Sequence, residues 1–426
     1  MRPRRVEPAA ARPPFQVGRT GNPGAMDSTL ALASEGYAWL PDRWRAHTGP
    51  IVRTRLMGQR AVALRGVEAV RFFYDERHVR RRGALPEPVV ATLFGHGGVQ
   101  GLDGEAHRER KALLMRVAAS PEGVEALAEQ FALAWEEAVP GWREQDTIVL
   151  FDEAGVVLTR AVTRWAGVPV AGQEVRPLAA DLLAMVDGFA TAGPRHWRAR
   201  RARKEREAWL AGLVADVRRG SAPVPEDSGL ARIAWHRDAD GSLLPADTAA
   251  VEVLNVLRPT VAVAWYAAFA AHALHRWPAH RERLADADHA YAFADEVRRF
   301  YPFAPFVAGR AATDLTWEGE HIPAGTLLLL DLYGQNHDAE VWGDPYTFRP
   351  DRFRHGDIAP DVLVPQGGGD AATGHRCPGE DATRALIAAL AARLAGLSYT
   401  VPQQDLAIPL GHIPTRPRSG MVLAVE

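Results

Sequence analysis

One cysteine constrains this chain more than any other residue. Cys377 is the only cysteine among 426 residues, and it lies in the turn Gly374–Glu380, directly before an apolar, alanine-rich segment. One thiol cannot close an intramolecular disulfide or supply the paired cysteines of a zinc site. Such a thiol is either a small buried hydrophobe or a reactive group. A turn that leads into a helix favours the second interpretation, because unpaired backbone N–H groups and the helix dipole stabilise a thiolate.

A thiolate in such a turn is a nucleophile or a metal ligand. Pro378 follows the sulfur and suits the first position of a helix. His375 lies two residues before the sulfur and Gly379 two residues after it, and this spacing favours a ligand.

Three motifs together resemble the haem-thiolate cytochromes, the cytochrome P-450 superfamily. They are the cysteine turn, the helical segment Glu296-Val297-Arg298-Arg299 and the segment Phe348-Arg349-Pro350-Asp351-Arg352-Phe353. An acid and an arginine three residues apart are by themselves usually a solvated ion pair. The resemblance implies that Cys377 is the axial ligand of haem b iron, and that Glu296, Arg299 and Arg352 form a buried network below the haem.

The hydrophobic pattern predicts a mainly α protein with small peripheral β-sheets, and the resemblance implies a cytochrome P-450 type fold in a single large domain. Helical periodicity occurs in residues 66–74, 107–118, 123–138, 179–190, 197–218, 246–277, 290–300 and 378–394. β-rich pieces occur at 51–56, 60–64 and 326–330, and near the C-terminus 411–415 and 421–425 are expected to pair.

The ends, charge and hydropathy of the chain limit its location and partners. Residues 1–25 are rich in Pro, Arg and Ala and lack the apolar core of a secretory signal, so we expect a disordered or mis-annotated extension before a catalytic domain at 26–426. The formal net charge of -2 gives no reason to expect nucleic acid. The longest apolar run, 259–274, is too short for a membrane span and suits a buried helix. We expect a cytoplasmic protein.

Arg258-Pro259 is the second informative site, because it lies inside the longest helical pattern. The arginine is surrounded by Leu254, Leu257, Val261 and Val263, and burying it is costly unless an anion meets it. The proline removes a backbone hydrogen bond, so the helix should kink. Arg258 could also extend to solvent or pair with Glu252.

The resemblance favours a functional role for this pair. In most monooxygenases of the superfamily an acid and an alcohol at these positions relay protons, and Arg258 and Pro259 replace them, with Thr260 one step beyond. This replacement is similar to the fatty-acid peroxygenase branch, which includes peroxide-driven hydroxylases and alkene-forming decarboxylases. The glycine-rich loop Gln366–Asp370, which lacks the usual phenylalanine seven residues before the cysteine, also resembles that branch.

These residues imply substrate-assisted chemistry. Peroxide cleavage needs a proton removed from one oxygen and returned to the other. A fatty-acid carboxylate held in a bidentate pair by Arg258 could move that proton, and oxygen would then enter at Cα or Cβ. Gln100 falls where hydroxylating members have glutamine and the alkene-forming member has histidine, so we expect hydroxylation with a minority of terminal alkene. The substrates are a fatty acid and hydrogen peroxide, with no redox partner required.

Further residues are assigned by position in the family pattern. Four residues resemble donors to the haem propionates: His107, Lys111, Arg310 and His375. Five others correspond to positions that line the acyl channel: Phe94, Val186, Phe189, Phe303 and Ala304.

Two alternatives to a peroxygenase stay open. One is a monooxygenase that acts on a carboxylate substrate with electrons from a redox partner. The other is a non-catalytic haem-binding or lipid-binding protein.

Overall fold

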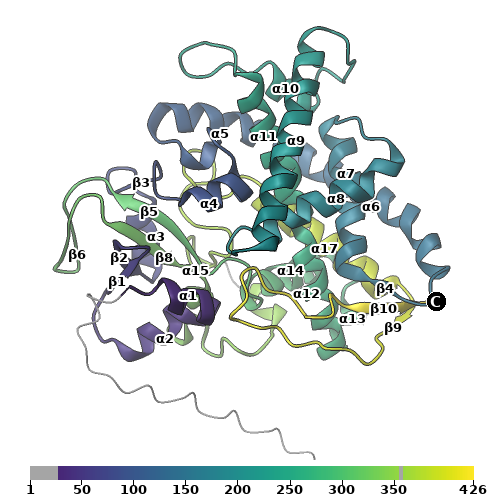
Figure 1. Cartoon of the computed structure of the whole chain (residues 1–426). Helices are drawn as coiled ribbons and strands as arrows, with labels where there is room; N and C mark the ends of the chain where they lie inside the picture. Colours follow the sequence, from purple (N-terminus) through teal and green to yellow (C-terminus); the bar gives the residue numbers. More distant parts are fainter. Residues whose placement is uncertain (1–26, 355–357) are drawn as a thin grey trace, which may run out of the picture.

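The computed structural model describes residues 27–354 and 358–426, so the expected N-terminal extension lies outside the described residues. Helices dominate the described chain, as expected, and small sheets lie at its periphery. In Figure 1 the largest sheet and the N-terminal helices lie on the left, and the long helices pack together on the right.

The largest sheet has the strand order β1-β2-β8-β5-β3. Its strands are β1 (Val52–Leu56), β2 (Gln59–Leu64), β8 (Leu327–Asp331), β5 (Phe306–Ala311) and β3 (Val79–Arg80). Side chains of β2 and β8 alternate between two apolar clusters because successive residues of a strand face opposite sides. Leu328 and Leu330 pack toward Phe73 of α3 (Val67–Tyr74), whereas Leu327 and Leu329 pack toward Trp39.

The helical core encloses a long central element that the sequence predicts as one helix with a kink. It consists of α11 (Ala246–Val261) and α12 (Val263–Arg276), separated at Ala262. Pro259 cannot donate a backbone hydrogen bond, and the break follows three residues later. In the described part of the chain this 246–276 unit is long and apolar enough to cross a membrane, but 89% of its apolar window is buried within the protein.

The other long helices surround this unit. They are α5 (Gly104–Ala118), α6 (Pro121–Arg143), α7 (Leu150–Ala166), α8 (Gly172–Asp187), α9 (Pro194–Arg218), α14 (Ala287–Phe300) and α17 (Glu380–Gly396). Shorter elements connect them: α1 (Thr29–Glu35), η1 (Gly36–Ala38), α2 (Trp39–Ala46), α4 (Glu87–Val89), η2 (Val90–Phe94), η3 (Val99–Gly101), α10 (Gly229–Ala234), α13 (His280–Arg283), α15 (Leu332–Asn336), α16 (Ala339–Trp342) and η4 (Pro350–Phe353).

The C-terminal pairing predicted from the sequence is wrong in its partner. Strand β10 (Val422–Val425) pairs with β4 (Ile148–Val149) and β9 (Tyr399–Thr400), not with residues 411–415. Pro414 has no N–H to donate to a ladder. Leu410 lies directly before residues 411–415, and its carbonyl accepts a hydrogen bond from the Tyr37 N–H at 2.9 Å. This contact holds the segment against η1. A two-stranded hairpin, β6 (Leu315–Trp317) and β7 (Glu320–Ile322), completes the sheets.

Candidate active site

Cys377 lies in the turn that leads into α17, and hydrogen-bond donors are directed at its sulfur. The helix begins at Glu380 with Gly379 as its N-cap, so Pro378 precedes the helix and does not occupy its first position as expected. The side-chain amide of Gln366 donates to Sγ at 3.6 Å. Burial raises the pKa of the thiol, and the Gly379 N–H opposes that shift. A free thiolate is therefore disfavoured here, and the site suits a sulfur whose charge a metal ion neutralises.

Gln366 is held in place by a second set of contacts, and its role was not predicted from the sequence. Its Oε1 accepts from Arg298 Nε at 3.2 Å, and its Nε2 also reaches Thr383 Oγ1 at 3.1 Å. Arg298 is buried and pairs with Asp295 at 2.9 Å and with Glu380. The amide that faces the sulfur is thus fixed by an ion-pair network on α14 and α17.

The glycine-rich loop before the cysteine passes closely over α3. A Cβ on Gly367 would lie 2.3 Å from Tyr74 Oη, and a Cβ on Gly368 would lie 2.2 Å from Val70 Cγ1. Gly367 and Gly369 also have φ of +95° and +74°, which side chains rarely adopt. Three glycines in sequence are therefore required by contact with the helix and by backbone geometry.

The structure brings together Glu296, Arg299 and Arg352. The Glu296 carboxylate meets Arg299 in a bidentate pair, with both distances 2.8 Å, and lies 3.1 Å from Arg352 Nε. Arg299 Nη1 also donates to the carbonyls of Asn336 and Pro345, both at 2.9 Å. Glu296 and Arg299 are fully buried, so the group is an internal clamp between α14 and the segment around η4 and not a surface ion pair.

His107, His375 and Lys111 meet above the cysteine turn. The two imidazoles stack with ring centroids 3.7 Å apart, and Lys111 Nζ donates to the carbonyl of Arg376. Burial lowers the pKa of Lys111 to about 8, and it lowers the pKa values of His107 and His375 to about 4 and about 2. Nδ1 of His107 is buried and has no hydrogen-bond partner among the residues that the structure describes.

Arg81 joins this cluster, although it was not among the predicted residues. It is buried, and its positive charge contributes to the low pKa of His375. The carboxylate of Asp103 lies 3.9 Å from His375 Nε2. Several buried donors with little negative charge beside them fit the two carboxylates of a haem.

Arg310 is directed elsewhere. Its guanidinium donates to the carbonyl of Gly83 at 2.6 Å, to the carbonyl of Gly325 at 3.1 Å and to Gln59 Oε1 at 2.6 Å. The structure does not bring it together with the histidine pair by any of these contacts, and its role toward haem stays a prediction.

Arg258 is buried in α11 with 6% of its surface exposed, and no carboxylate lies within ion-pair distance of it among the described residues. It donates only weakly to Asn255 Oδ1 at 3.4 Å, and Nε has no hydrogen-bond partner within residues 27–354 and 358–426. Burial and the charge of Arg203 together lower its pKa to about 9, whereas a thiolate at Cys377 acts in the opposite direction. The guanidinium therefore lies within electrostatic range of the sulfur.

Glu252, the alternative partner for Arg258, is already occupied. Its Oε1 accepts from Arg110 Nη1 at 2.8 Å and from the Val99 N–H at 2.9 Å. Asn255 connects this carboxylate to the site, because its Nδ2 lies 3.2 Å from Glu252 Oε2 and 3.3 Å from Gln100 Oε1. Asn255 thus lies between Gln100 and Arg258, because its side chain contacts both. The sequence did not predict this role for the asparagine.

Thr260 and Pro259 offer no proton to the space beside Arg258. The hydroxyl of Thr260 donates to the carbonyl of Val256 at 2.9 Å, and Pro259 has no N–H. Side chains at these two positions therefore contribute no proton relay in this arrangement.

The predicted channel residues divide into two groups. The ring of Phe94 lies 5.9 Å from the Arg258 guanidinium carbon, and so belongs to the same site. Phe303 stacks on Tyr266 at 4.8 Å, and Ala304 packs beside the largest sheet. Val186 is buried near the end of α8, and Phe189 follows in the next turn. That these four line an acyl channel stays a prediction.

Comparisons with known proteins agree with this geometry. Residues 288–399 match the cytochrome P-450 family model. Among curated proteins, pluviatolide synthase from Sinopodophyllum hexandrum is 34% identical over 93 residues, a local match that spans 21% of this chain and 19% of that enzyme.

Solved structures match over nearly the whole length. A variant of cytochrome P450SP alpha (CYP152B1) is 44% identical, with a TM-score of 0.91, over 93% of this chain and 98% of its own. Cytochrome P450EX alpha (CYP152N1) with myristic acid is 39% identical, with a TM-score of 0.90, over 93% and 96%. An OleT variant in complex with arachidonic acid is 34% identical, with a TM-score of 0.91, over 96% and 98%. The chain therefore belongs to the cytochrome P-450 family, and within it to the fatty-acid peroxygenase branch that its Arg-Pro pair resembles.

Proposed function

We propose that this chain uses hydrogen peroxide to hydroxylate long-chain fatty acids at the α or β carbon, with minor decarboxylation to terminal alkenes. One observation carries the proposal. Arg258 is a buried cation without a counter-ion in the described part of the chain, and a thiolate at Cys377 favours its charge. A carboxylate supplied by the substrate would complete the missing pair.

Haem b bound through Cys377 would supply the oxidising power. His107, Lys111, His375 and Arg81 would hold its propionates. The Gln366 amide donates to the sulfur and limits the negative charge that builds up on it.

Arg258 would orient the substrate. A planar guanidinium binds both oxygens of a carboxylate, which fixes the acid end of the chain and leaves Cα and Cβ nearest to the reacting oxygen. The carboxylate itself would take the proton from one peroxide oxygen and return it to the other. Thr260 cannot take this role while its hydroxyl donates to Val256.

Gln100 supports hydroxylation as the main outcome. Its amide oxygen is engaged by Asn255, and an amide does not release a proton as an imidazolium does. Decarboxylation to an alkene would then stay the minor route.

Ligands of the similar structures support a carboxylate substrate. Myristic acid, arachidonic acid and (R)-ibuprofen are bound in those structures, and all three are carboxylic acids. The use of peroxide without a redox partner, and the cytoplasmic location, are parts of the proposal that follow from the sequence.

The test is to incubate the haem-loaded protein with myristic acid and hydrogen peroxide, without any reductase, and to identify products by mass spectrometry. We expect α- or β-hydroxymyristic acid and a smaller amount of terminal alkene. Product only with a reductase and its electron donor would favour the redox-partner-dependent monooxygenase. A spectral change on adding myristic acid, with no product under either condition, would favour a binding protein.

A further inference from the structure

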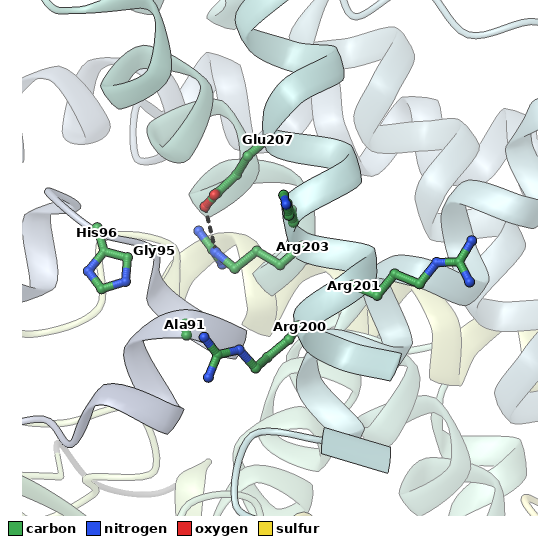
Figure 2. A pocket seen from close by; sticks show the side chains of 8 residues that line it. Ala91, Gly95, His96, Arg200, Arg201, Arg203 and Glu207 are labelled. Atoms are coloured by element: carbon green, nitrogen blue, oxygen red, sulfur yellow. Dashed lines mark hydrogen bonds and ion pairs between the residues drawn. The ribbon is translucent and has the colours of Figure 1, made fainter. Parts of the chain in front are cut away.

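A cleft of about 350 Å³ lies between the η2 turn and α9. Four of its lining residues are cationic residues of α9, although the side chain of Arg201 points away from the η2 turn in Figure 2. The lining residues are Ala91, Gly95, His96, Arg200, Arg201, Arg203, Lys204 and Glu207. In Figure 2, Arg203 extends from α9 toward Gly95 and Arg200 reaches toward Ala91.

Arg203 forms the inner end of this cleft. The residue is only 1% exposed, with Nε paired to Glu207 at 2.6 Å and Nη1 donating to the carbonyl of Leu93 at 2.7 Å. Its Nη2 is buried and has no hydrogen-bond partner in the part of the chain that the structure describes. A Cβ on Gly95 would lie 2.2 Å from Nη2, so a glycine at this position is what allows the guanidinium to pack against the chain that follows η2.

Lys204 supplies unpaired charge at the rim. Arg200 pairs with Glu87 at 3.2 Å and Arg201 pairs with Glu205 at 2.8 Å. No carboxylate lies within ion-pair distance of Lys204 in the described ranges 27–354 and 358–426. An exposed lysine and a buried, incompletely bonded arginine therefore face one cleft that has a single carboxylate in its lining.

The cleft is separated from the inner site by two consecutive residues. Phe94 faces Arg258, whose guanidinium carbon lies 5.9 Å from its ring, and Gly95 faces Arg203. The two guanidinium groups are close enough for the charge of Arg203 to disfavour the charge of Arg258. A negative group in the cleft would therefore be separated from the buried guanidinium of Arg258 by Phe94 and Gly95.

We propose that this cleft is an outer carboxylate site, in which Lys204 and Arg203 bind the headgroup of a fatty acid before it passes to Arg258. The inference rests on the proposed function for the identity of the ligand. Lys204 would capture the anion at the rim, and the positive charge of Arg203 would attract it toward the inner end. The site acts on substrate association, because its cations attract the carboxylate before Arg258 does.

The test is the rate at which haem-loaded protein binds myristic acid below its micellar concentration, followed by the optical change at the haem. We expect Lys204→Glu to slow association by about tenfold at low ionic strength and to leave kcat at saturating substrate unchanged. The matched control is Arg198→Glu, which makes the same charge change on an exposed residue of α9 outside the lining. It should leave the rate within about twofold of the parent protein.

A second arm distinguishes a site from general attraction. Inorganic phosphate, compared with chloride at equal ionic strength, should raise the KM for myristic acid in the parent protein and not in Lys204→Glu. Equal rates for both charge-reversal variants, or equal effects of phosphate and chloride on the parent protein, would overturn the outer site. If the parent protein binds myristic acid but forms no product with peroxide, the proposed function fails, and the binding rates still decide this inference.

Discussion

Most buried arginines among the described residues pair with acids, whereas Arg258 and Arg81 have no carboxylate within ion-pair distance. Arg81 donates to the carbonyl of Ala308 at 2.7 Å, so Arg258, with one long hydrogen bond, is the less satisfied of the two. Arg299 meets Glu296, Arg110 meets Glu252 and Asp238, and Arg203 meets Glu207. Leaving a buried cation unpaired costs several kcal/mol, so a fold tolerates it where a ligand completes the pair. The missing counter-ion is thus a more specific marker of function than the surrounding apolar residues.

Replacing Arg258 should separate activity from folding. We expect Arg258→Ala to weaken fatty-acid binding by about 2–5 kcal/mol and to remove most peroxide-driven oxidation, with an unchanged haem spectrum. Without substrate the variant should unfold at an equal or higher denaturant concentration, because an unpaired buried charge is removed. Arg258→Lys should show intermediate binding, since it keeps a cation but not the bidentate geometry. Optical titration, product analysis and urea unfolding check this.

The matched control for Arg258→Ala is Arg276→Ala, at the exposed end of α12. It should bind and oxidise fatty acids like the parent protein. Near-normal turnover in Arg258→Ala would contradict the role of the guanidinium.

At this scale the sequence indicated residues whose chemistry conflicts with their surroundings. A lone cysteine in a turn and an arginine among leucines and valines are visible without a structure. Gln366, Arg81 and Asn255 are not, because an amide or an arginine is ordinary until the fold brings it to a sulfur, a histidine pair or another arginine. Arg310 shows the opposite case, since its order in the chain matches the family pattern while its donors are taken by backbone carbonyls.

Among the elements, α14 and the segment around η4 depend on one buried carboxylate. We expect Glu296→Ala to destabilise the fold by about 3–5 kcal/mol, because Arg299 and Arg352 would stay buried without their shared counter-ion. Urea unfolding measures the loss, and haem retention after gel filtration measures its effect on the cysteine turn. Glu282→Ala, an exposed acid on α13, is the control and should change stability by less than about 0.5 kcal/mol.

A buried histidine on α12 makes stability depend on pH. His272 lies 2.7 Å from Tyr301 Oη, and burial lowers its pKa to about 4 from 6.5. Between these values the unfolded chain binds more protons than the folded one, so stability is complete above pH 6.5 and falls as the pH drops toward 4. In His272→Gln, the free energy of unfolding lost between pH 6.5 and pH 4 should be smaller by up to about 3 kcal/mol.

The control for the pH experiment is His275→Gln, on the exposed side of the same helix. Urea unfolding of the three proteins between pH 4 and 7 provides the measurement. A parent curve as flat as that of His272→Gln would show that His272 titrates normally.

Element boundaries from the sequence were good where the apolar period was strong and poor elsewhere. The start of α3 and the end of α9 were predicted within one residue. Helix α7 was missed, because Val156, Val157, Thr159, Val162 and Thr163 are β-branched residues of modest helix propensity and tertiary packing decides their state. The central strand β5 was also missed, since Gly309 interrupts its pattern and its pairing with β8 joins distant parts of the chain.

For the molecule as a whole, the sequence predicted a mainly helical protein with small peripheral sheets. It did not predict how residues from distant elements are arranged around Cys377. The proposed haem site collects residues from distant parts of the chain, including Arg81, His107, Lys111 and Cys377. These buried cationic and polar groups repel one another or lack partners when no anion lies between them. The prosthetic group should therefore act as a structural element of the fold.

Removing haem should destabilise the entire chain. We expect the haem-free protein to melt several degrees below the loaded form, because ligand binding to the folded state alone adds stability. Scanning calorimetry or circular dichroism measures the difference, and adding hemin back is the control that should restore the higher temperature. Equal melting temperatures would show that the buried cluster is stable without its anions.

Gly367–Gly369 pass close to Val70 and Tyr74, so the loop before Cys377 and helix α3 cannot be exchanged independently in a chimeric protein. Grafting the bulkier, phenylalanine-containing ligand loop of an ordinary monooxygenase into this scaffold would force side chains into the space that α3 already fills. Such a transplant would have to bring its own version of that helix. In any such chimera, loop and helix would therefore have to be exchanged together.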